Sequence, residues 1–287
     1  MNTDRSLKLT AFFRTAAIAT LIVASLTAVQ AQPSGGPYGP VRQSWPLPQN
    51  AGRIFYVAPD GDKNAPGETV TAPSTIETAI SKAVTGDVII LRGGTYRTGD
   101  LLLNQGIIMQ PYMDELPVLK GSSVATGWRD LGNGLWVTKW DRLFPSAPQS
   151  WWQRLRSGKD TPLHRFNDDM VFIDGRFLQS AGFEGEVDEN TFFIDYSTGL
   201  VYIGVDPKDK LVEITAHNVA IHRITCEHNG RASDGRGPVI RGITFTQYAY
   251  RALEIDGKDP EGISPETGHG KDVVGTTLEH CTISFCS

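Results

Sequence analysis

Cysteine is scarce in this sequence of 287 residues, which contains only Cys226, Cys281 and Cys286. A scaffold held together by disulfides would need many more cysteines, and an odd count leaves one without a partner. A structural zinc site would need closely spaced pairs of cysteine or histidine, which the chain lacks. We therefore expect the cysteines to act mostly as small apolar residues in β-strands. A Cys281–Cys286 bridge is the alternative.

Positive charge is not in excess either, since the formal net charge is -5 at pH 7. A nucleic-acid-binding protein needs a basic face, so the composition argues against nucleic acid as a partner. The sequence also has no phosphate-binding Walker loop, no Gly-x-Ser-x-Gly elbow and no His-Glu-x-x-His motif. The sequence therefore contains no motif that indicates a cofactor.

Long apolar runs are confined to the N-terminus, where residues 15–29 carry no charge and follow three basic residues. This stretch is shorter than the roughly 20 residues that span a bilayer. Small side chains in Val29-Gln30-Ala31 suit cleavage before Gln32. We predict that residues 1–31 are a cleavable signal peptide, with an N-terminal membrane anchor as the alternative. The protein is then secreted or periplasmic, and it does not contact the membrane after cleavage.

Turn-forming residues dominate the next segment, residues 32–52, which we expect to be a flexible leader. Residues 54–57 have the composition of a short strand. Ser74 and Glu77 have the spacing of a capping box at the start of a helix. Apolar residues then recur at helical spacing, and Gly86 ends the helix. These apolar residues are Ile76, Ala79, Ile80, Ala83 and Val84. Residues 88–91 form a fully apolar strand.

Tryptophan is concentrated in residues 123–215, which hold five of the six in the chain. Residues 191–195 and 200–203 have the pattern of a hairpin. We interpret this part of the chain as a small antiparallel β module inserted into the main fold. The adjacent Trp151 and Trp152 are candidates for stacking on a sugar ring, since neighbouring residues cannot easily both point inward. The alternative is that the aromatic residues form the core of the module.

Three later segments share one spacing of apolar residues, in which the first two positions are three apart and the last two are two apart. They are Ile221-x-x-Ile224-x-Cys226, Ile240-x-x-Ile243-x-Phe245 and Leu278-x-x-Cys281-x-Ile283. This spacing fits a strand, a tight bend and a second strand that face the same core. Segments that cannot bury a core alone must stack on one another. The pattern predicts a parallel β-helix, with a β-sandwich as the alternative.

Most of the sequence after the predicted signal peptide resembles the N-terminal part of right-handed parallel β-helix proteins of the pectate-lyase-like superfamily. The resemblance rests on residues 55–61, 74–83 and 86–96, and it extends to residues 170–175 and 191–203. It implies an all-β fold, a single-stranded right-handed parallel β-helix with an N-terminal capping helix. On this reading the cap and first coils occupy residues 53–122, the inserted module residues 123–215, and further coils residues 216–287. The chain stops directly after a core-facing strand, so we expect it to be incomplete at its C-terminus.

The resemblance also implies an exported protein whose partner is an extracellular polysaccharide. The superfamily includes polysaccharide lyases, glycoside hydrolases and non-catalytic surface or carbohydrate-binding proteins. A hydrolase needs two carboxylates at the scissile bond. A lyase needs a base, and a cation such as Ca²⁺ to neutralise the sugar carboxylate.

Candidate catalytic residues gather in and around the polar stretch 256–272. Asp256, His269 and Lys271 are the candidates within it, and a solvated loop with ordinary charges is the alternative. Further candidates flank it: Glu254, Glu279 and His280. No spacing motif among them distinguishes a lyase from a hydrolase, and none defines a metal site.

Overall fold

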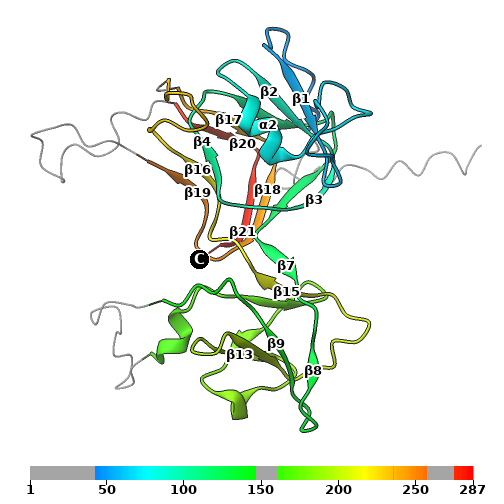
Figure 1. Cartoon of the computed structure of the whole chain (residues 1–287), viewed down its shortest axis with the longest axis vertical. Coiled ribbons are helices and arrows are strands. Elements are labelled where there is room, and N and C mark those ends of the chain that lie inside the picture. Colours follow the sequence, from blue (N-terminus) through cyan, green and yellow to red (C-terminus); the bar gives the residue numbers. More distant parts are fainter. Residues whose placement is uncertain (1–42, 147–160, 235, 257–274, 287) are drawn as a thin grey trace, which may run out of the picture. The chain divides into compact units, whose positions relative to one another are not determined.

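β-Strands dominate the computed structural model, which describes residues 43–146, 161–234, 236–256 and 275–286 (Figure 1). The α-helix among these residues is α2 (Ile76–Lys82). Two short 3₁₀ helices, η2 (Leu163–Phe166) and η3 (Glu184–Glu186), lie later in the chain. The prediction of a mostly β protein is therefore confirmed. Within the described residues, no helix has the length and apolarity needed to cross a membrane.

Helix α2 begins where its apolar spacing predicts, but it ends at Lys82, before the predicted stop at Gly86. The predicted capping box is also wrong. The N-cap is Thr75, whose hydroxyl accepts a hydrogen bond from the backbone N–H of Thr78 at 3.3 Å. Ser74 is fully buried, and Glu77 instead accepts a hydrogen bond from the Thr98 hydroxyl. Thr75 satisfies the same need for a side-chain acceptor at the helix start, one residue later. The predicted apolar face is buried except for Val84.

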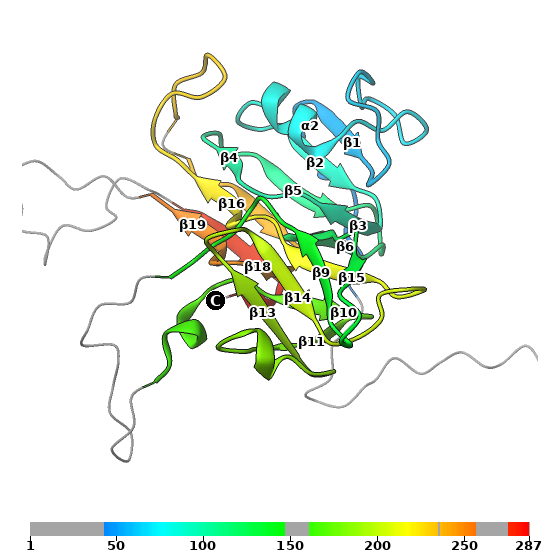
Figure 2. The same cartoon turned by 60° about the horizontal axis from the view of Figure 1, so that its bottom comes forward.

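Three sheets are parallel throughout. The first parallel sheet has the order β1 (Ile54–Val57), β2 (Val88–Leu91), β5 (Ile108–Pro111), β17 (Val239–Arg241), β20 (Thr277–Glu279). The second has the order β3 (Gly94–Arg97), β6 (Pro117–Lys120), β18 (Thr244–Tyr248), β21 (Thr282–Cys286). The third contains β4 (Leu101–Leu103), β16 (Val219–Arg223) and β19 (Arg251–Ile255). Figure 2 shows β1, β2 and β5 running side by side.

The chain visits these sheets in a fixed order, so each circuit adds one strand to each sheet. Strands β2, β3 and β4 form one circuit, and β17, β18 and β19 form another. The circuits are in register: Ile89 pairs with Met109, Met109 with Ile240, and Ile240 with Leu278. Because paired residues of neighbouring strands lie about 4.8 Å apart, their side chains stack in a column.

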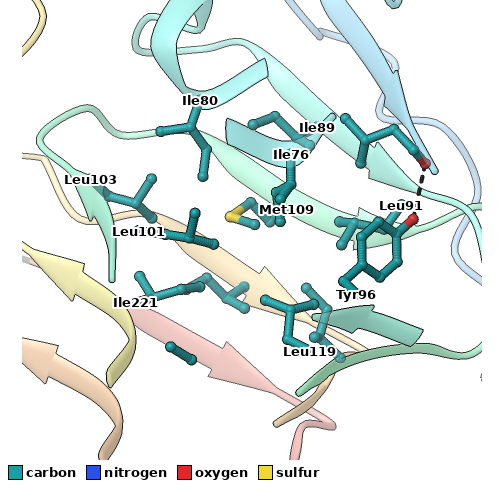
Figure 3. Packing of buried hydrophobic residues seen from close by; sticks show 14 of the residues in the cluster. Ile76, Ile80, Ile89, Leu91, Tyr96, Leu101, Leu103, Met109, Leu119 and Ile221 are labelled. Atoms are coloured by element: carbon teal, nitrogen blue, oxygen red, sulfur yellow. Dashed lines mark hydrogen bonds between the residues drawn. The ribbon is translucent and has the colours of Figure 1, made fainter. Parts of the chain in front are cut away.

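The main core lies between the three parallel sheets (Figure 3). Ile89, Met109 and Leu119 are fully buried there, together with Ile221 of the third sheet. Helix α2 contributes Ile76 from one side of this cluster. The Tyr96 hydroxyl donates a hydrogen bond to the backbone oxygen of Val57 at 3.0 Å, so the ring is buried with its polar atom satisfied. Full burial of an aliphatic side chain such as Ile89 or Leu119 contributes about 1.5–3 kcal/mol to the stability of the fold.

The predicted spacing of apolar residues is confirmed for two of the three segments. Ile240 pairs with Leu278, and Phe245 pairs with Ile283. The Ile221 segment is not equivalent to them, because it lies in the third sheet and pairs with Leu101 and Leu253.

The strands β20 and β21 leave apolar side chains uncovered. Leu278 and Ile283 are 42% and 51% exposed, although their register partners are buried. Among the described residues, β20 and β21 pair on one side alone. The column of inward side chains is therefore open at these strands.

The cysteines follow the sequence prediction in part. Cys281 and Cys286 pack against the main core, and burial raises the pKa of both thiols. Both are free, so the alternative of a bridge between them is wrong. Cys226 is exposed, and the expectation that it faces the core is also wrong. It follows the end of β16, where the inward alternation stops.

Strands β7–β15 form two further sheets and pair, within the described residues, with one another alone. One has the order β11 (Arg176–Phe177), β10 (Val171–Ile173), β15 (Val212–Thr215), β7 (Ser122–Val124). The other has the order β12 (Gln179–Ser180), β13 (Thr191–Asp195), β14 (Leu200–Ile203), β9 (Trp136–Lys139), β8 (Arg129–Asp130). All pairs are antiparallel except β12 with β13.

The predicted hairpin in this region is confirmed, since β13 and β14 pair antiparallel with Phe193 opposite Tyr202. Figure 2 shows β9, β14 and β13 side by side. The region has its own apolar cluster, and Trp128, Trp136 and Trp140 pack against it. These three tryptophans therefore serve the core rather than an exposed sugar platform.

The chain leaves the parallel sheets after β6 and returns to them at β16, and its two crossing points touch. The Gly121 carbonyl accepts hydrogen bonds from the backbone N–H groups of Ala216 and His217, at 2.8 and 2.9 Å. Next to this junction, the fully buried carboxylate of Glu213 forms ion pairs with Lys120 Nζ at 2.8 Å and with Arg97 Nη2 at 2.5 Å. A buried charge needs such partners, because desolvation without them is costly.

We expect Glu213→Gln to lower the free energy of unfolding by about 3–5 kcal/mol, because it leaves two cations without their buried counter-charge. Glu115→Gln is the matched control. It removes a carboxylate that is 28% exposed and pairs with Arg92 at 2.9 Å, and such pairs contribute about 0–1 kcal/mol. Denaturant unfolding of both variants measures the difference. Equal losses of unfolding free energy in the two variants would show that burial of Glu213 does not increase the contribution of its ion pairs.

Candidate functional site

Strands β16 and β19 of the third parallel sheet bring polar side chains together on its outer face. Side chains alternate along a strand, so Ile221, whose side chain is buried in the core, is followed by His222 on the outside. His222 is paired in register with Glu254 of β19. Asp256 lies two residues beyond Glu254, on the same side, and its backbone N–H donates to the Arg223 carbonyl at 2.8 Å.

His222, Glu254 and Asp256 form a compact cluster, which we call the HED cluster. One nitrogen or oxygen from each side chain lies within 4.8 Å of those of the other two. His222 Nε2 lies 2.8 Å from Asp256 Oδ1. Because an ionised carboxylate accepts but does not donate, Nε2 donates this hydrogen bond. All three side chains are partly exposed.

A cation and a phenol adjoin the HED cluster. Arg251 Nη1 lies 2.7 Å from Glu254 Oε1. Arg251 Nη2 donates to the Tyr250 hydroxyl at 2.5 Å, and the guanidinium lies 3.9 Å from the centroid of the Tyr250 ring. Tyr250 is 40% exposed. Arg251 therefore links the carboxylate of the HED cluster to an exposed aromatic ring.

The HED cluster offers the groups needed for several reactions. One carboxylate oxygen of Glu254 lies within 4.8 Å of one of Asp256. The paired carboxyl groups of retaining glycosidases are likewise close, about 5–5.5 Å apart. His222 Nδ1 could accept a proton. A single divalent cation could also bridge the three side chains. One imidazole with two carboxylates suits Zn²⁺ or Mn²⁺ better than Ca²⁺, which prefers oxygen ligands throughout.

Two of the residues named from the sequence, Asp256 and Glu254, lie in the HED cluster. Glu279 ends β20 in the first parallel sheet, and the ring of His280 lies 5.7 Å from that of Trp45. These two are therefore not brought to the cluster. The candidates His269, Lys271, Trp151 and Trp152 lie outside the described residues.

His222 was missed by sequence reasoning, which found no shared geometry among the histidines. The register could have found it. His222 and Glu254 each follow an inward aliphatic residue, Ile221 and Leu253, that pair across β16 and β19. When two inward residues are paired across neighbouring strands, the outward residues that follow them are paired as well.

Two solved structures resemble this chain. One, described as the complex structure of XylC with xylose, has a TM-score of 0.52 and 16% sequence identity, and the match covers 77% of this chain and 44% of that one. A second, described as a glycoside hydrolase, has a TM-score of 0.40 and 13% identity over 69% of this chain and 51% of that one. At such identities the first likeness concerns the fold alone, and the second carries no argument.

The chain spans less than half the length of the XylC chain and about half that of the glycoside hydrolase. No protein-family model matches the sequence, and no curated protein matches it.

A second unusual group, Asp169, is buried among strands β7–β15. Its Oδ2 accepts hydrogen bonds from the backbone N–H of Phe144 at 2.8 Å and from the Tyr196 hydroxyl at 2.9 Å. Its Oδ1 has no hydrogen-bond partner in the described part of the chain. Burial raises the pKa of Asp169 to about 6, although these two hydrogen bonds oppose the shift.

We expect Asp169→Asn to stabilise the protein more at pH 7.5 than at pH 4.5. The folded-state pKa of about 6 lies above the ordinary value of 3.8, so ionisation of Asp169 opposes folding above pH 6. This cost is relieved as the pH falls from 6 toward 3.8. The difference in unfolding free energy between variant and wild type should change by about 2 kcal/mol between the two pH values.

Chemical denaturation at both pH values measures this change. Asp195→Asn is the control, because hydrogen bonds from Ser197 and Thr198 lower the pKa of Asp195 to about 2. Its ionisation favours folding above pH 3.8, so this variant should not gain stability at pH 7.5. A pH-independent effect of Asp169→Asn would contradict the raised pKa.

Proposed function

We propose that this chain belongs to an exported carbohydrate-active enzyme that acts on an extracellular polysaccharide. We further propose that its parallel sheets wind as a right-handed parallel β-helix. The fixed order in which the chain visits the three sheets supports that winding. The likeness to XylC supports the fold, and the xylose in that complex favours a sugar as the ligand here. Export follows from the predicted signal peptide.

The observation that carries the enzymatic proposal is the HED cluster, where two carboxylates and an imidazole share the outer face of one sheet. A polysaccharide lying across β16 and β19 would meet all three side chains. We propose hydrolysis, in which Glu254 and Asp256 act as the carboxylate pair, one as the acid and one as the nucleophile. His222 holds Asp256 through the 2.8 Å hydrogen bond and is a positioning residue.

Lyase chemistry is the second candidate, and the imidazole favours it. His222 Nδ1 would remove the proton next to the sugar carboxylate, and Arg251 or a bound Ca²⁺ would neutralise that carboxylate. A non-catalytic carbohydrate-binding protein is the third candidate. It would need the exposed Tyr250 and the polar face of the sheet, but no proton transfer.

We expect the purified protein to release reducing ends from at least one polysaccharide of a panel, without new ultraviolet absorbance from unsaturated uronates. Asp256→Asn and Glu254→Gln should each lower kcat by about 100-fold or more, since a positioned acid or base contributes about 10²–10⁴-fold. Asp100→Asn is the matched control. It alters another histidine–carboxylate pair, His217 Nδ1 with Asp100 Oδ2 at 3.0 Å, and neither residue belongs to the HED cluster.

Each other outcome has a definite meaning. New absorbance would replace hydrolysis with the lyase reaction. Polysaccharide binding without any product would overturn the enzymatic proposal in favour of a binding protein. Equal losses in Asp100→Asn and Asp256→Asn would show that the HED cluster has no special role.

A further inference from the structure

A cavity of about 450 Å³ lies among strands β12 and β13 and helix η2, and it shares no residue with the HED cluster. Its volume falls in the range of about 300–1,000 Å³ that small-molecule sites occupy. Its described lining residues are Ser146, Leu163, His164, Asn167, Ser180, Ala181, Gly182, Phe192, Phe193, Ile194 and Tyr196. Polar and apolar groups therefore share its wall.

The polar side chains among the described residues of this wall are those of serine, asparagine, histidine and tyrosine. No lysine, arginine, aspartate or glutamate is among the described residues that line the cavity. Burial lowers the pKa of His164, with a further contribution from Arg165, so the imidazole is neutral at pH 7. Burial also raises the pKa of Tyr196, which keeps its phenol protonated. An anionic ligand would lose its hydration here without a cation among the described lining residues. It would also approach the carboxylate of Glu186, which accepts a hydrogen bond from the backbone N–H of Gly182 in the wall at 2.8 Å.

Hydrogen bonds fix several of these groups in place. Asn167 Oδ1 accepts from the backbone N–H of Ser146 at 3.1 Å, which leaves the amide NH₂ as a donor. The Ser180 hydroxyl donates to the His164 carbonyl at 3.3 Å, so its oxygen can accept. Tyr196 donates to buried Asp169 and likewise retains acceptor capacity. Fixed donors and acceptors suit a ligand that carries several hydroxyl groups.

The aromatic part of the wall suits the same ligand. Phe193 lies in β13, half-buried, with its ring centroid 5.7 Å from that of Tyr202. Phe192 and Ile194, which flank it in β13, are buried. A sugar ring presents C–H groups on its faces and hydroxyls on its edge, so it can contact aromatic carbon and polar groups at once.

We propose that this cavity binds one or two uncharged sugar residues, as an accessory subsite for the polysaccharide on which the HED cluster acts. The inference rests on the proposed function for the identity of the polymer. It adds the substrate class, a neutral rather than an acidic polysaccharide. It also assigns binding to strands β12 and β13, and thus separates binding from the proposed catalytic residues on β16 and β19.

Two matched probes test the charge preference: methyl β-D-glucopyranoside and methyl β-D-glucopyranosiduronic acid. They share one ring and differ in the carboxylate at C6. We expect saturation-transfer NMR at pH 7.5 to detect the neutral glycoside, with affinity for the uronide weaker by about 10-fold or more. That factor corresponds to about 1.4 kcal/mol.

Two variants locate the binding. Asn167→Ala should weaken binding of the neutral glycoside by up to about 10-fold, the value of one lost hydrogen bond. Ser180→Ala provides a second, milder change should the first disturb folding, which circular dichroism would reveal. Asn190→Ala is the matched control, because its Oδ1 accepts from Arg176 Nη1 at 2.7 Å and the residue does not line the cavity.

Equal affinity for the two probes would overturn the proposal. So would loss of binding in Asp256→Asn with full binding in both cavity variants, since the sugar would then sit at the HED cluster. Turnover of a polysaccharide without any glycoside binding overturns the cavity alone. Binding that responds to Asn167→Ala without turnover of any polysaccharide overturns the proposed hydrolysis alone.

Discussion

Register between successive circuits of the chain is the constraint on which the rest of this structure depends. One circuit cannot bury its own inward side chains, so Ile89, Met109 and Ile240 must stack in a column across β2, β5 and β17. A slip of one residue would expose the apolar side chains of the whole column to water. Each Å² of apolar surface exposed in this way costs about 25 cal/mol. The same register fixes the outer face. His222 and Asp256 are 34 positions apart in sequence, yet the stacking of Ile221 on Leu253 brings them within hydrogen-bonding distance.

The stacked circuits accommodate strands β7–β15 because the chain returns to the point from which it left. Gly121 and Ala216 are hydrogen-bonded, so β16 resumes the register beside β4 as though nothing intervened. Buried Glu213 then joins a strand of that region to Lys120 and Arg97 of the second parallel sheet. An ion pair of this kind adds little net stability compared with an apolar contact, but its geometry is specific. It joins β15 to β6 and β3 through charged groups rather than through apolar packing.

Local patterns predicted the elements well, and pairing between distant elements poorly. The strand at residues 88–91, the apolar face of α2 and the β13–β14 hairpin were all predictable, because alternation or helical spacing is a property of neighbouring residues. The Ile221 segment was misplaced because strands of all three parallel sheets carry the same inward spacing, so spacing cannot say to which sheet a strand belongs. The HED cluster was predicted in part for the same reason: Asp256 and Glu254 are neighbours in sequence, whereas His222 joins them through register. The cap at Thr75 rather than Ser74 reflects a choice between adjacent hydroxyls that only packing resolves.

The two proposed sites constrain one another through the charge of the substrate. A lyase acts on a sugar whose carboxylate makes the adjacent proton acidic enough for a base such as His222 to remove. The cavity beside Asn167 and Tyr196 has no described cation to receive such a carboxylate, and the guanidinium of Arg251 is already paired with Glu254. Hydrolysis makes no such demand, because protonation of the leaving oxygen and attack at the anomeric carbon need only the two carboxylates. The proposed subsite and the proposed hydrolysis therefore require the same kind of substrate, a polysaccharide of uncharged sugars.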